Sequence, residues 1–349
     1  MSCIPSLIRL AEARSTRTRG MHKTEKGAER MKKKVSFIIN PMSASGKTGQ
    51  RWPSLAPKVS AAFPNSEFIF TRSAGEAETL AYKAIQDGSE QVVAVGGDGT
   101  MNEVLNGYVK ANKSNHDHPV SIGLLAMGTG SDLCRSLGIP RRFEDAISVL
   151  KQAPQDVDCG RVTLGEKVRF FDNIASLGIS GEIAKHFEKY GKTGAFSYIT
   201  GLFKSARAYD KRGFSIDYRS PNQEWQHYEL PDAFIAIIAN AQYFGGGMHI
   251  APKAIMNDGL FHCVLVKSVS ALEIMRYLPS IFRGNHLKHP PFHDFHASEI
   301  KIKTTVPSWL EVDGEPCFQI LPNQAVHLTV DSARLSLHLA QGAKAVHKA

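Results

Sequence analysis

The stretch Gln91-Val92-Val93-Ala94-Val95-Gly96-Gly97-Asp98-Gly99-Thr100 joins a β-branched run to a cluster of glycines. Its first half, Gln91–Val95, is typical of a buried parallel strand, and Asn102–Val109 after it has the apolar spacing of a helix. Glycines at such a junction let backbone N–H groups approach phosphate oxygens, because no Cβ is in the way. The N-terminus of the helix adds a dipole that favours anions. The turn Gly96–Thr100 is therefore a candidate phosphate-binding loop.

The carboxylate in this turn, Asp98, needs a different partner, because it would repel a phosphate. It suits a Mg²⁺ ion or a hydrogen-bonded network beside the phosphates, and a purely structural turn with a local Asx contact is the alternative. Two standard nucleotide motifs are excluded. A P-loop needs glycine where the chain has Pro41, and the dinucleotide fingerprint needs glycine where the chain has Asn102.

Strand and helix patterns alternate along the first half of the chain, which predicts a doubly wound α/β sheet. We expect this α/β nucleotide-binding domain to span residues 33–157. The expected strands are Val35–Ile39, Glu67–Phe70, Gln91–Val95 and Val120–Leu125, and the expected helices are Glu76–Gln86 and Asn102–Val109.

The second half consists mainly of short alternating segments separated by Gly, Pro and Asn, which predicts an antiparallel sandwich or barrel. We expect a β-sandwich-like substrate domain over 158–320 and final strands over 321–349 that return to the first domain, making the fold α+β overall. One helical region, Ile183–Tyr209, interrupts the pattern. The expected strands are Arg161–Leu164, Arg169–Ser176, Phe214–Tyr218, Ala233–Ala239, Leu260–Lys267, Ile300–Thr304, Ala325–Val330 and Arg334–Leu339.

The positive charge of the chain is concentrated at its start. Ten Lys/Arg and three Glu in the first 34 residues give that segment a charge of +7, which leaves +2 of the total +9 for the rest. A nearly neutral body argues against nucleic acid as a partner. We expect residues 1–32 to be a disordered basic tail, or an artefact of an upstream start. A basic arm for anionic lipid and a transit peptide remain alternatives, the last opposed by the glutamates.

The cysteines and the apolar runs indicate a compartment. Five dispersed cysteines without paired spacing suggest reduced thiols, as in the cytoplasm. No apolar run approaches the ~18 residues that cross a bilayer, so we expect any membrane contact to be peripheral.

Five separate blocks of sequence resemble the diacylglycerol kinase catalytic-domain family, which includes sphingosine and ceramide kinases and soluble bacterial lipid kinases. The resemblance runs from about Val35 to about Leu339. It departs from the family pattern at Ser131, where asparagine is usual, and in two extra residues in the first block. The blocks are Asn40-Pro41 with Ser45-Gly46-Lys47, Gly97–Glu103, Gly128–Asp132, Phe244–Met248 with Ala251-Pro252 and Asp258-Gly259-Leu260, and Asp313-Gly314-Glu315.

The resemblance implies a fold like that of NAD kinases and phosphofructokinases, and transfer of the γ-phosphate of ATP to a hydroxyl of a diacylglycerol-like or sphingoid lipid. Asp313 would be the general base and Glu315 would support it. Asp258 would bind Mg²⁺ with the carbonyls of Ile255 and Leu260. The enzyme would be cytoplasmic and peripheral at the membrane surface, and a homodimer is left open. The implied ATP-binding residues are Asn40, Lys47, Thr71, Gly96, Gly97, Asp98, Gly99, Thr100, Met101, Asn102, Glu103, Gly128 and Thr129.

Each implied role has a structural alternative. Asp313-Gly314 is also a common hairpin turn between Trp309–Val312 and Cys317–Leu321, and Asp258-Gly259 has the same ambiguity. The apolar segment Phe196–Phe203 suits either the core or a lipid entry surface. For the function, an NAD kinase-like enzyme and a non-catalytic lipid-binding relative are the alternatives. The histidines His286, His289, His293 and His296 are expected to be loop residues rather than a zinc cluster.

Overall fold

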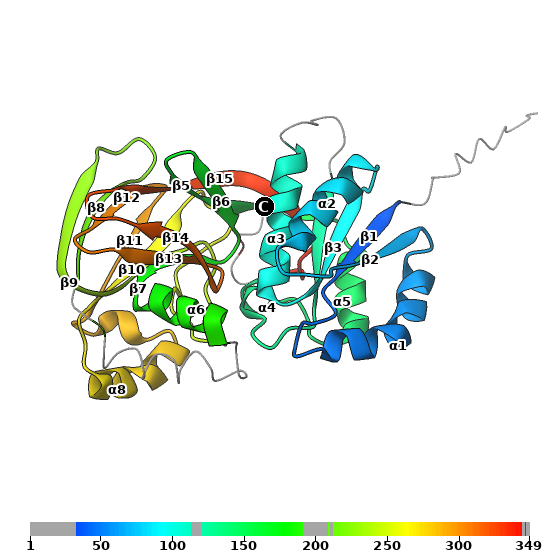
Figure 1. The fold of residues 1–349 in the computed structure, drawn as a ribbon, viewed down its shortest axis with the longest axis horizontal. Helices are drawn as coiled ribbons and strands as arrows, with labels where there is room; N and C mark the ends of the chain where they lie inside the picture. Colours follow the sequence, from blue (N-terminus) through cyan, green and yellow to red (C-terminus); the bar gives the residue numbers. More distant parts are fainter. Residues whose placement is uncertain (1–32, 113–119, 191–208, 210–211, 344–345, 347–349) are drawn as a thin grey trace, which may run out of the picture. The chain divides into compact units, whose positions relative to one another are not determined.

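The first half of the chain forms a parallel sheet covered by helices on both faces (Figure 1). The computed structural model describes residues 33–112, 120–190, 209, 212–343 and 346. Its parallel strands lie in the order β2-β1-β3-β4. They span Val35–Ile39 (β1), Ser66–Phe70 (β2), Gln91–Gly96 (β3) and Ser121–Ala126 (β4), and the helices span Lys47–Ala62 (α1), Glu76–Gln86 (α2), Asp98–Asn112 (α3), Asp132–Leu137 (α4) and Phe143–Leu150 (α5).

Side chains of alternate strand positions enter two separate cores. Phe37 of β1 and Val93 of β3 pack with Trp52 of α1 and Ile147 of α5 on one face. On the other face, the strands pack against α2 and α3, where Leu105 is fully buried. Burial on both faces explains why these strands are continuous apolar runs.

The six elements predicted for this half are confirmed within two residues at most ends, although α3 begins at Asp98, four residues before the predicted start. Three helices were not predicted. Helix α1 contains Pro53 and Pro57, which sequence rules treat as helix breakers. Helices α4 and α5 are short, with 6 and 8 residues, and leave little periodicity to detect.

The second half is antiparallel, in the order β14-β13-β7-β9-β8-β12-β15, with β10 and β11 beyond β9, and β5 and β6 beyond β15. One core lies between its strands, and a second packs under helices α6 (Ile179–Tyr190) and α8 (Ala271–Phe282). The strands are β5 (Gln155–Leu164), β6 (Lys167–Phe171), β7 (Ile174–Gly178), β8 (Arg212–Arg219), β9 (Gln226–Ala239), β10 (Phe261–Lys267), β11 (Phe292–Ala297), β12 (Glu299–Thr304), β13 (Ser308–Val312), β14 (Glu315–Ile320) and β15 (Val326–Leu337).

Several predictions for this half were wrong in detail. The expected strand Arg169–Ser176 is two strands, β6 and β7, which separate at Asp172-Asn173 because the backbone there turns toward Asp313. The two expected final strands are one strand, β15, with an irregularity between Asp331 and Leu335. Strand β11, helix α8 and the turn η1 (His286–Lys288) were not expected. His293 and His296 therefore lie in a strand rather than in a loop.

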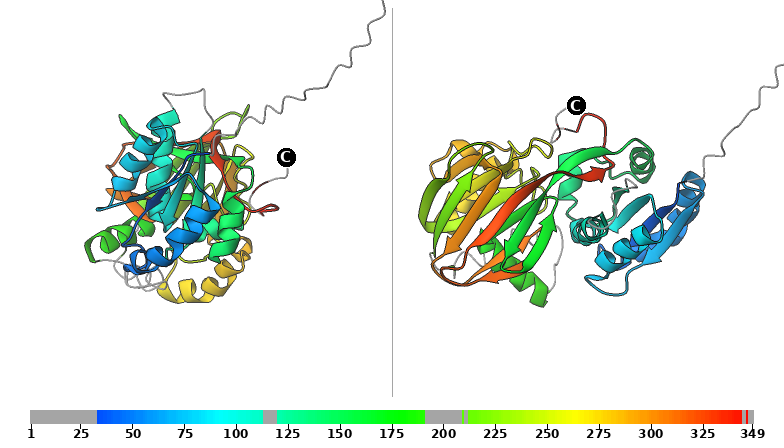
Figure 2. Two further views of the ribbon diagram at one scale, coloured as in Figure 1. Left: turned by 90° about the vertical axis from the view of Figure 1, so that its right-hand side faces the viewer. Right: turned by 90° about the horizontal axis from the view of Figure 1, so that it is seen from above.

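Strand β15 connects the two halves (Figure 2). It pairs with β12 and β5 of the antiparallel half, and at its end Leu337 pairs in parallel with Ile122 of β4. The chain therefore does return to the first half, and Lys33–Ala349 forms one unit. The domain boundary near residue 157 stays a prediction, and Phe196–Phe203 lies outside the described residues. No helix in the described part of the chain is long and apolar enough to cross a membrane.

Candidate functional site

The two glycine turns of the α/β half touch each other at the carboxyl edge of its sheet. The carbonyl of Gly96 accepts hydrogen bonds from the backbone N–H of Met127 (2.8 Å) and of Gly128 (2.9 Å). A Cβ at Gly128 would lie 2.4 Å from Cα of Gly97, and one at Gly96 would lie 2.5 Å from Oγ1 of Thr100. Glycine is therefore required at Gly96 and Gly128 by the contact itself, whatever binds there.

The first loop is tied to this edge by Asn40. Its Nδ2 donates to Thr100 Oγ1 at 3.1 Å, and its Oδ1 accepts from the backbone N–H of Met42 at 3.0 Å. Thr71, buried at the end of β2, donates its backbone N–H to the carbonyl of Ile39 at 2.9 Å. Asn40, Thr71 and Thr100 thus gather where three parallel strands end, the usual ligand position in such sheets.

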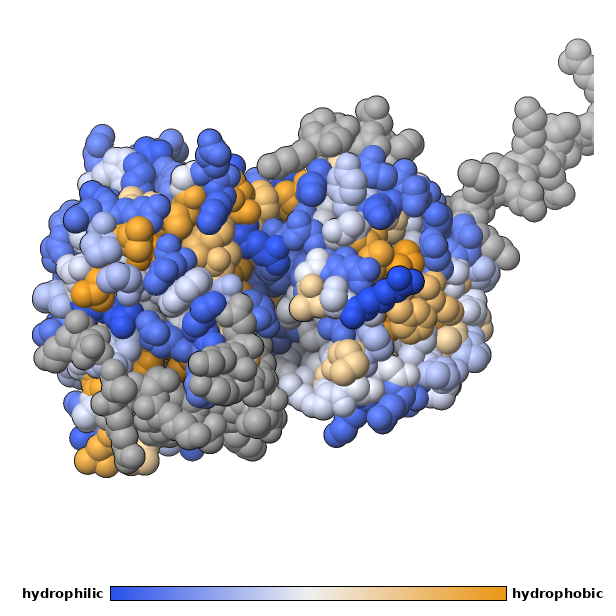
Figure 3. Space-filling model, in the orientation of Figure 1, coloured by the Kyte–Doolittle hydropathy of each residue, from blue (hydrophilic) through white to orange (hydrophobic). Residues whose placement is uncertain are grey.

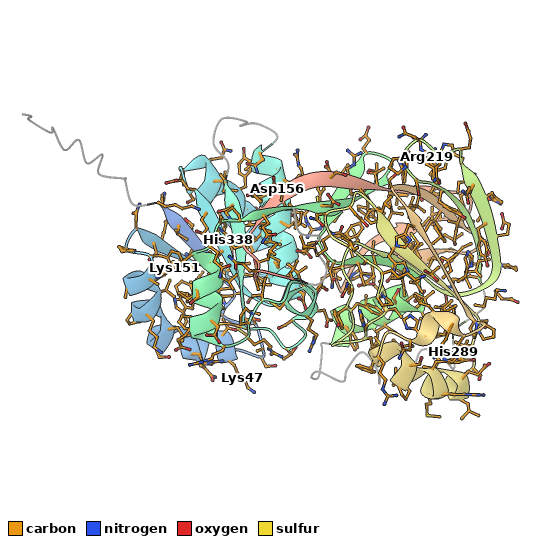
Figure 4. All side chains as sticks on the ribbon, turned by 180° about the vertical axis from the view of Figure 1, so that it is seen from behind. Lys47, Lys151, Asp156, Arg219, His289 and His338 are labelled. Atoms are coloured by element: carbon orange, nitrogen blue, oxygen red, sulfur yellow. The ribbon has the colours of Figure 1, made fainter. Side chains whose placement is uncertain are left out.

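A cationic pocket opens beside the second glycine turn. It has a volume of about 290 Å³, and Lys47, Arg51 and Arg141 line it together with Thr48, Ala44 and Met127–Thr129. Figure 4 marks Lys47 at the start of α1. None of the described residues that line the pocket is acidic. Three cations on one pocket suit a multiply charged anion such as a chain of phosphates.

Thr48 also lines the pocket, but its hydroxyl oxygen is buried. Thr48 is fully buried, and its Oγ1 has no hydrogen-bond partner among the described residues. A buried hydroxyl without a partner is costly unless a ligand or water completes it. This oxygen has no accessible surface, so it would have to become exposed before a ligand in the pocket could bond it.

Sequence reasoning included Lys47, Gly128 and Thr129 but missed Arg51 and Arg141. Arg51 lies four residues after Lys47, on the same face of α1. This helix was not predicted, because it contains two prolines. Arg141 follows α4, and its guanidinium donates to the carbonyl of Gly128 at 3.3 Å. A prediction of helix α1 would have placed Arg51 beside Lys47, whereas no local sequence pattern indicates that Arg141 lines the pocket.

Asp98 joins three of the sequence blocks. Its Oδ2 accepts the backbone N–H of Asp132 at 3.2 Å, and a Cβ at Gly130 would lie 2.9 Å from the same oxygen. Asp132 in turn accepts the backbone N–H of Gly246 at 2.8 Å and pairs with Arg135 at 2.6 Å. Burial raises the pKa of Asp132, and the nearby Asp98 carboxylate raises it further. The carboxylates of these loops therefore form a network, as expected for Asp98.

The carboxylate of Asp313 lies at the centre of a hydrogen-bonded cluster. Its Oδ2 accepts from Nδ2 of Asn102 at 2.7 Å and from the backbone N–H of Asp172 at 3.2 Å. Its Oδ1 accepts from the backbone N–H of Asn173 at 3.1 Å and of Ile174 at 2.8 Å. Four donors match the four acceptor positions of a carboxylate. These bonds hold Asp313 at φ 48°, in the left-handed region, where non-glycine residues are uncommon.

Asp313 and Gly314 form the predicted hairpin turn between β13 and β14. The turn places Glu315 at the surface, where its Oε1 would lie 3.6 Å from a Cβ at Gly99. A carboxylate from the antiparallel half therefore stands beside the first glycine turn. The two expected catalytic residues are brought to the same place as the expected nucleotide loop.

Asp172 is a buried acid that sequence reasoning did not single out. Burial raises its pKa well above the usual value, and the neighbouring Asp313 carboxylate raises it further. Burial also raises the pKa of Asp313, against the hydrogen bonds from Ile174, Asn102 and Asp172, which lower it. Two acids this close cannot both ionise easily, so burial and the Asp313 carboxylate both favour the protonated form of Asp172. The polar pair Asp172-Asn173 inside an apolar run was the available signal.

Three residues of the expected nucleotide loop face the protein interior. Met101 is fully buried in the core of the α/β half. Asn102 bonds Asp313 and also the carbonyl of Phe170 at 2.9 Å. Glu103 accepts the backbone N–H of Gly75 and Ala77, at 2.9 and 3.0 Å, at the start of α2. These contacts support the loop, and an ATP contact of these side chains stays a prediction.

The expected magnesium residues lie in a turn of the antiparallel half. Asp258 is exposed, and its Oδ1 accepts the backbone N–H of Leu260 at 2.9 Å. Asp158 accepts the preceding N–H, that of Gly259, at 2.7 Å. No cluster of three His, Cys, Asp or Glu suited to a metal occurs among the residues with described positions. Carboxylate oxygen and carbonyls still fit a Mg²⁺ that keeps several waters.

Two family models match the chain one after the other. Residues 34–162 match the diacylglycerol kinase catalytic domain, and residues 173–334 match the YegS C-terminal NAD kinase beta sandwich-like domain. This pair of domains defines a class of kinases. The chain belongs to the diacylglycerol kinase catalytic-domain family, as the resemblance of its motifs predicted.

Named relatives agree with this assignment. A diacylglycerol kinase from Staphylococcus saprophyticus subsp. saprophyticus is 27% identical over 288 residues, which are 82% of this chain and 90% of that protein. A Pseudomonas putida protein named Probable lipid kinase YegS-like is 29% identical over 272 residues, 77% and 83% of the two chains. The crystal structure of a diacylglycerol kinase from Bacillus anthracis str. Sterne has a TM-score of 0.64 at 19% identity, covering 89% and 98% of the chains, and supports the fold. The predicted α+β fold class is confirmed.

Proposed function

We propose that this chain is an ATP-dependent lipid kinase that phosphorylates a hydroxyl of a diacylglycerol-like or sphingoid lipid. One observation carries the proposal: Asn102, which follows the first glycine turn, donates a 2.7 Å hydrogen bond to Asp313 of the distant β13–β14 hairpin. The same hairpin carries Glu315, and its carboxylate lies beside Gly99. A kinase needs a carboxylate next to the transferred phosphate, where it can accept the proton of the acceptor hydroxyl. The names of the relatives support a lipid acceptor.

The cationic pocket would bind the phosphates of ATP. Lys47, Arg51 and Arg141 supply charge, and the backbone of the glycine turns permits close approach. Gly128 borders the pocket and contacts Gly97, only two residues before Gly99. Phosphates in the pocket would therefore be continuous with the turn beside Glu315. Positioning and charge neutralisation of this kind supply most of the acceleration in phosphoryl transfer.

The contacts of the two acidic residues suggest different roles for them. Asp313 is buried and its oxygens already accept four hydrogen bonds, so it suits the task of holding the turn. Glu315 is exposed and suits the task of proton acceptor. The expectation that Asp313 is the general base stays untested, and the geometry favours Glu315. In the reaction, the lipid oxygen would form a bond to the γ-phosphorus as the bond to the β-bridging oxygen breaks. The hydroxyl proton passes to the carboxylate, and ADP leaves.

A Mg²⁺ ion fits the turn at Asp258, with the carbonyls of Ile255 and Leu260 as further oxygen ligands. The ion would be structural and would hold the turn in place. Asp158, which binds the N–H of Gly259, would orient the turn. We further propose a cytoplasmic enzyme that meets its lipid at the membrane surface.

The test is phosphate transfer from radiolabelled ATP with Mg²⁺ to dioctanoylglycerol, to sphingosine, and to NAD. We expect transfer to a lipid acceptor and none to NAD. Transfer to NAD alone would establish the NAD kinase alternative. ATP binding without transfer to any acceptor would establish a non-catalytic relative.

Variants of the two carboxylates separate their roles. Glu315→Gln should lower kcat by roughly 10²–10⁴-fold while leaving the dissociation constant of ATP and the melting temperature nearly unchanged. Asp313→Asn should lower kcat together with thermal stability, because an amide N–H₂ would face backbone N–H donors. Full activity of Glu315→Gln, with an inactive but stable Asp313→Asn, would show that Asp313 is the base.

A further inference from the structure

Helix α8 has a second apolar face that points away from the protein. Leu272 is 72% exposed, Met275 52% and Phe282 39%, so three of the large apolar side chains at the described surface belong to this one helix. Pro279 between them is also exposed. At 100° per residue, these four positions fall within about a quarter of the helix circumference. They form a stripe, which we call the α8 outer stripe.

The core contacts of α8 use a different face. Ile274 is buried, and Leu278 and Ile281 pack against the core cluster under the helix. The outer stripe is therefore not needed to hold α8 on the protein. In Figure 3, apolar atoms gather at the lower left, where Figure 1 places α8.

The charges next to the outer stripe are cationic. Arg276 and Arg283 are exposed and follow Met275 and Phe282 directly in the sequence, so they border the stripe along one side. The only acidic residue of the helix, Glu273, is engaged in its N-terminal capping box. Its carboxylate accepts from the N–H of Ser270 at 2.8 Å and from the Ser270 hydroxyl at 2.7 Å.

We propose that the α8 outer stripe is the surface by which this kinase docks on an anionic lipid bilayer, an inference that rests on the proposed lipid kinase function. An apolar stripe flanked by arginines is the pattern of helices that lie in the membrane interface. Apolar side chains enter the acyl boundary, and arginines meet the anionic head groups. The charge complementarity favours a bilayer over an uncharged protein groove.

The docking surface is connected to the candidate site by a short series of contacts. Gly284, at the end of α8, packs against His249, whose ring stacks on Tyr243 at 4.4 Å. The carbonyl of Tyr243 accepts from Nδ2 of Asn173 at 2.9 Å, and the backbone N–H of Asn173 binds Asp313. A helix resting on the bilayer would thus hold the catalytic hairpin near the source of substrate.

The experiment compares vesicle binding with catalysis in solution. The full chain carrying Leu272→Ser and Met275→Ser is sedimented with vesicles of phosphatidylcholine containing phosphatidylglycerol. Leu321→Ser, a matched control, removes an equally apolar side chain that is 54% exposed far along the chain from α8. We expect the α8 variant to bind at least ~10-fold more weakly than the wild type, and the control to bind like the wild type. The basic segment before residue 35 is present in all three proteins and cancels in the comparison.

Activity on dioctanoylglycerol, which dissolves as monomers, separates this inference from the proposed function. We expect the α8 variant to retain wild-type turnover on that substrate and to lose turnover on vesicle-borne diacylglycerol. Equal vesicle binding by wild type and α8 variant would overturn the docking surface even if the enzyme is a lipid kinase. A change of oligomeric state in the α8 variant, together with unchanged vesicle binding, would also overturn the docking surface. If the wild type binds vesicles through α8 but phosphorylates no lipid, the proposed function fails and the docking surface stands.

The arginines provide a second, independent measurement. Arg276→Gln with Arg283→Gln should reduce binding to vesicles that contain phosphatidylglycerol more than binding to pure phosphatidylcholine. Arg142→Gln, which removes another exposed cation, should change neither. Loss of the anionic-lipid preference only in the Arg142 variant would contradict the assignment to α8.

Discussion

Asp172 and Asp313 illustrate how much of this site depends on single buried charges. Both residues are buried, and the backbone N–H of Asp172 donates directly to Asp313 Oδ2 at 3.2 Å. The cluster holds the hairpin that carries Glu315, so the protonation state of Asp172 affects a residue that would touch substrate. Protonation of Asp172 would relieve the repulsion between the two carboxyl groups.

Replacing Asp172 with Asn should remove a pH-dependent loss of stability. A carboxyl whose pKa is higher in the folded protein than in the unfolded chain binds its proton more tightly when folded, so stability falls as pH rises above its unfolded value of 3.8. The Asn variant keeps a donor for Asp313 and cannot ionise. The difference in melting temperature, variant minus wild type, should therefore increase from pH 4 to pH 8. A difference that stays constant across this range would show that Asp172 does not hold a proton in the folded state.

Arg141 should contribute to ATP binding through the pocket. Arg141→Ala removes one of three cations and should raise KM for ATP about 10-fold, as loss of one charge-assisted contact does, with kcat changed less. Lys47→Ala should act in the same direction. Arg142→Ala, the exposed neighbour that is absent from the pocket, provides the control. An unchanged KM for ATP in both pocket variants would remove the pocket from the nucleotide site.

At the scale of elements, the site depends on loops that meet rather than on any one motif. The turn after β3 contacts the turn after β4, and the hairpin β13–β14 reaches the start of α3. At Gly96 and Gly128 the contacts leave no room for a Cβ, whereas a Cβ at Gly99 would lie at an ordinary 3.6 Å from Glu315. Gly96 and Gly128 are therefore needed for packing, and under the proposed function they would also let phosphate approach.

Gly128→Ala should disturb the nucleotide loops, because the new Cβ would lie 2.4 Å from backbone Cα of Gly97. We expect a loss of roughly 1–3 kcal/mol in unfolding free energy and a weaker affinity for ATP, measured by calorimetry. Gly165→Ala is the control. It has positive φ but open space around it, so it should lower stability without changing ATP affinity. Equal ATP affinity in the two variants would contradict the role of the Gly97–Gly128 contact.

At the scale of the whole molecule, β15 joins the two halves within one compact unit. Its residues enter both cores, with Leu328 in the antiparallel half and Leu335 and Leu337 in the α/β half. His338, marked in Figure 4, follows the strand; its N–H donates to the carbonyl of Ile122 at 2.9 Å, and its Nε2 lies 2.9 Å from Ser121 Oγ. The return of the chain therefore couples the halves through buried polar contacts as well as through apolar packing.

The buried His338 should make the protein sensitive to acid. Burial lowers its pKa to about 4, so the folded protein resists its protonation while the unfolded chain accepts it. The stabilisation is present above pH 6.5 and is lost as pH falls toward 4, a loss of about 3 kcal/mol if the whole shift is expressed. His338→Gln should flatten the dependence of unfolding free energy on pH in that range, measured by urea titration. The exposed His227→Gln should leave it nearly unchanged, and an equal slope in wild type and His338→Gln would refute the prediction.

The sequence by itself determined the elements whose signals are local. Strand β1 and helix α2 occur where the spacing of apolar residues and the turn residues predicted them. The pattern of a single strand or a single amphipathic helix is contained within about a dozen residues, so it can be read locally. The glycine turns and the hairpin at Asp313-Gly314 were predictable for the same reason. Helix α1 was missed, because Pro53 and Pro57 oppose a helix that tertiary packing of Trp52 and Val59 stabilises.

Only the tertiary structure decided which distant groups meet. Arg141 reaches the pocket, the backbone of Asp172 binds the Asp313 carboxylate, and β15 runs from one half to the other, each through contacts between residues far apart in the chain. No local pattern encodes such contacts, since they follow from the packing of complete elements. The sequence therefore determined the chemistry available to this kinase family member. The fold determined which carboxylate is buried, which one is exposed beside Gly99, and which face of α8 carries exposed apolar side chains.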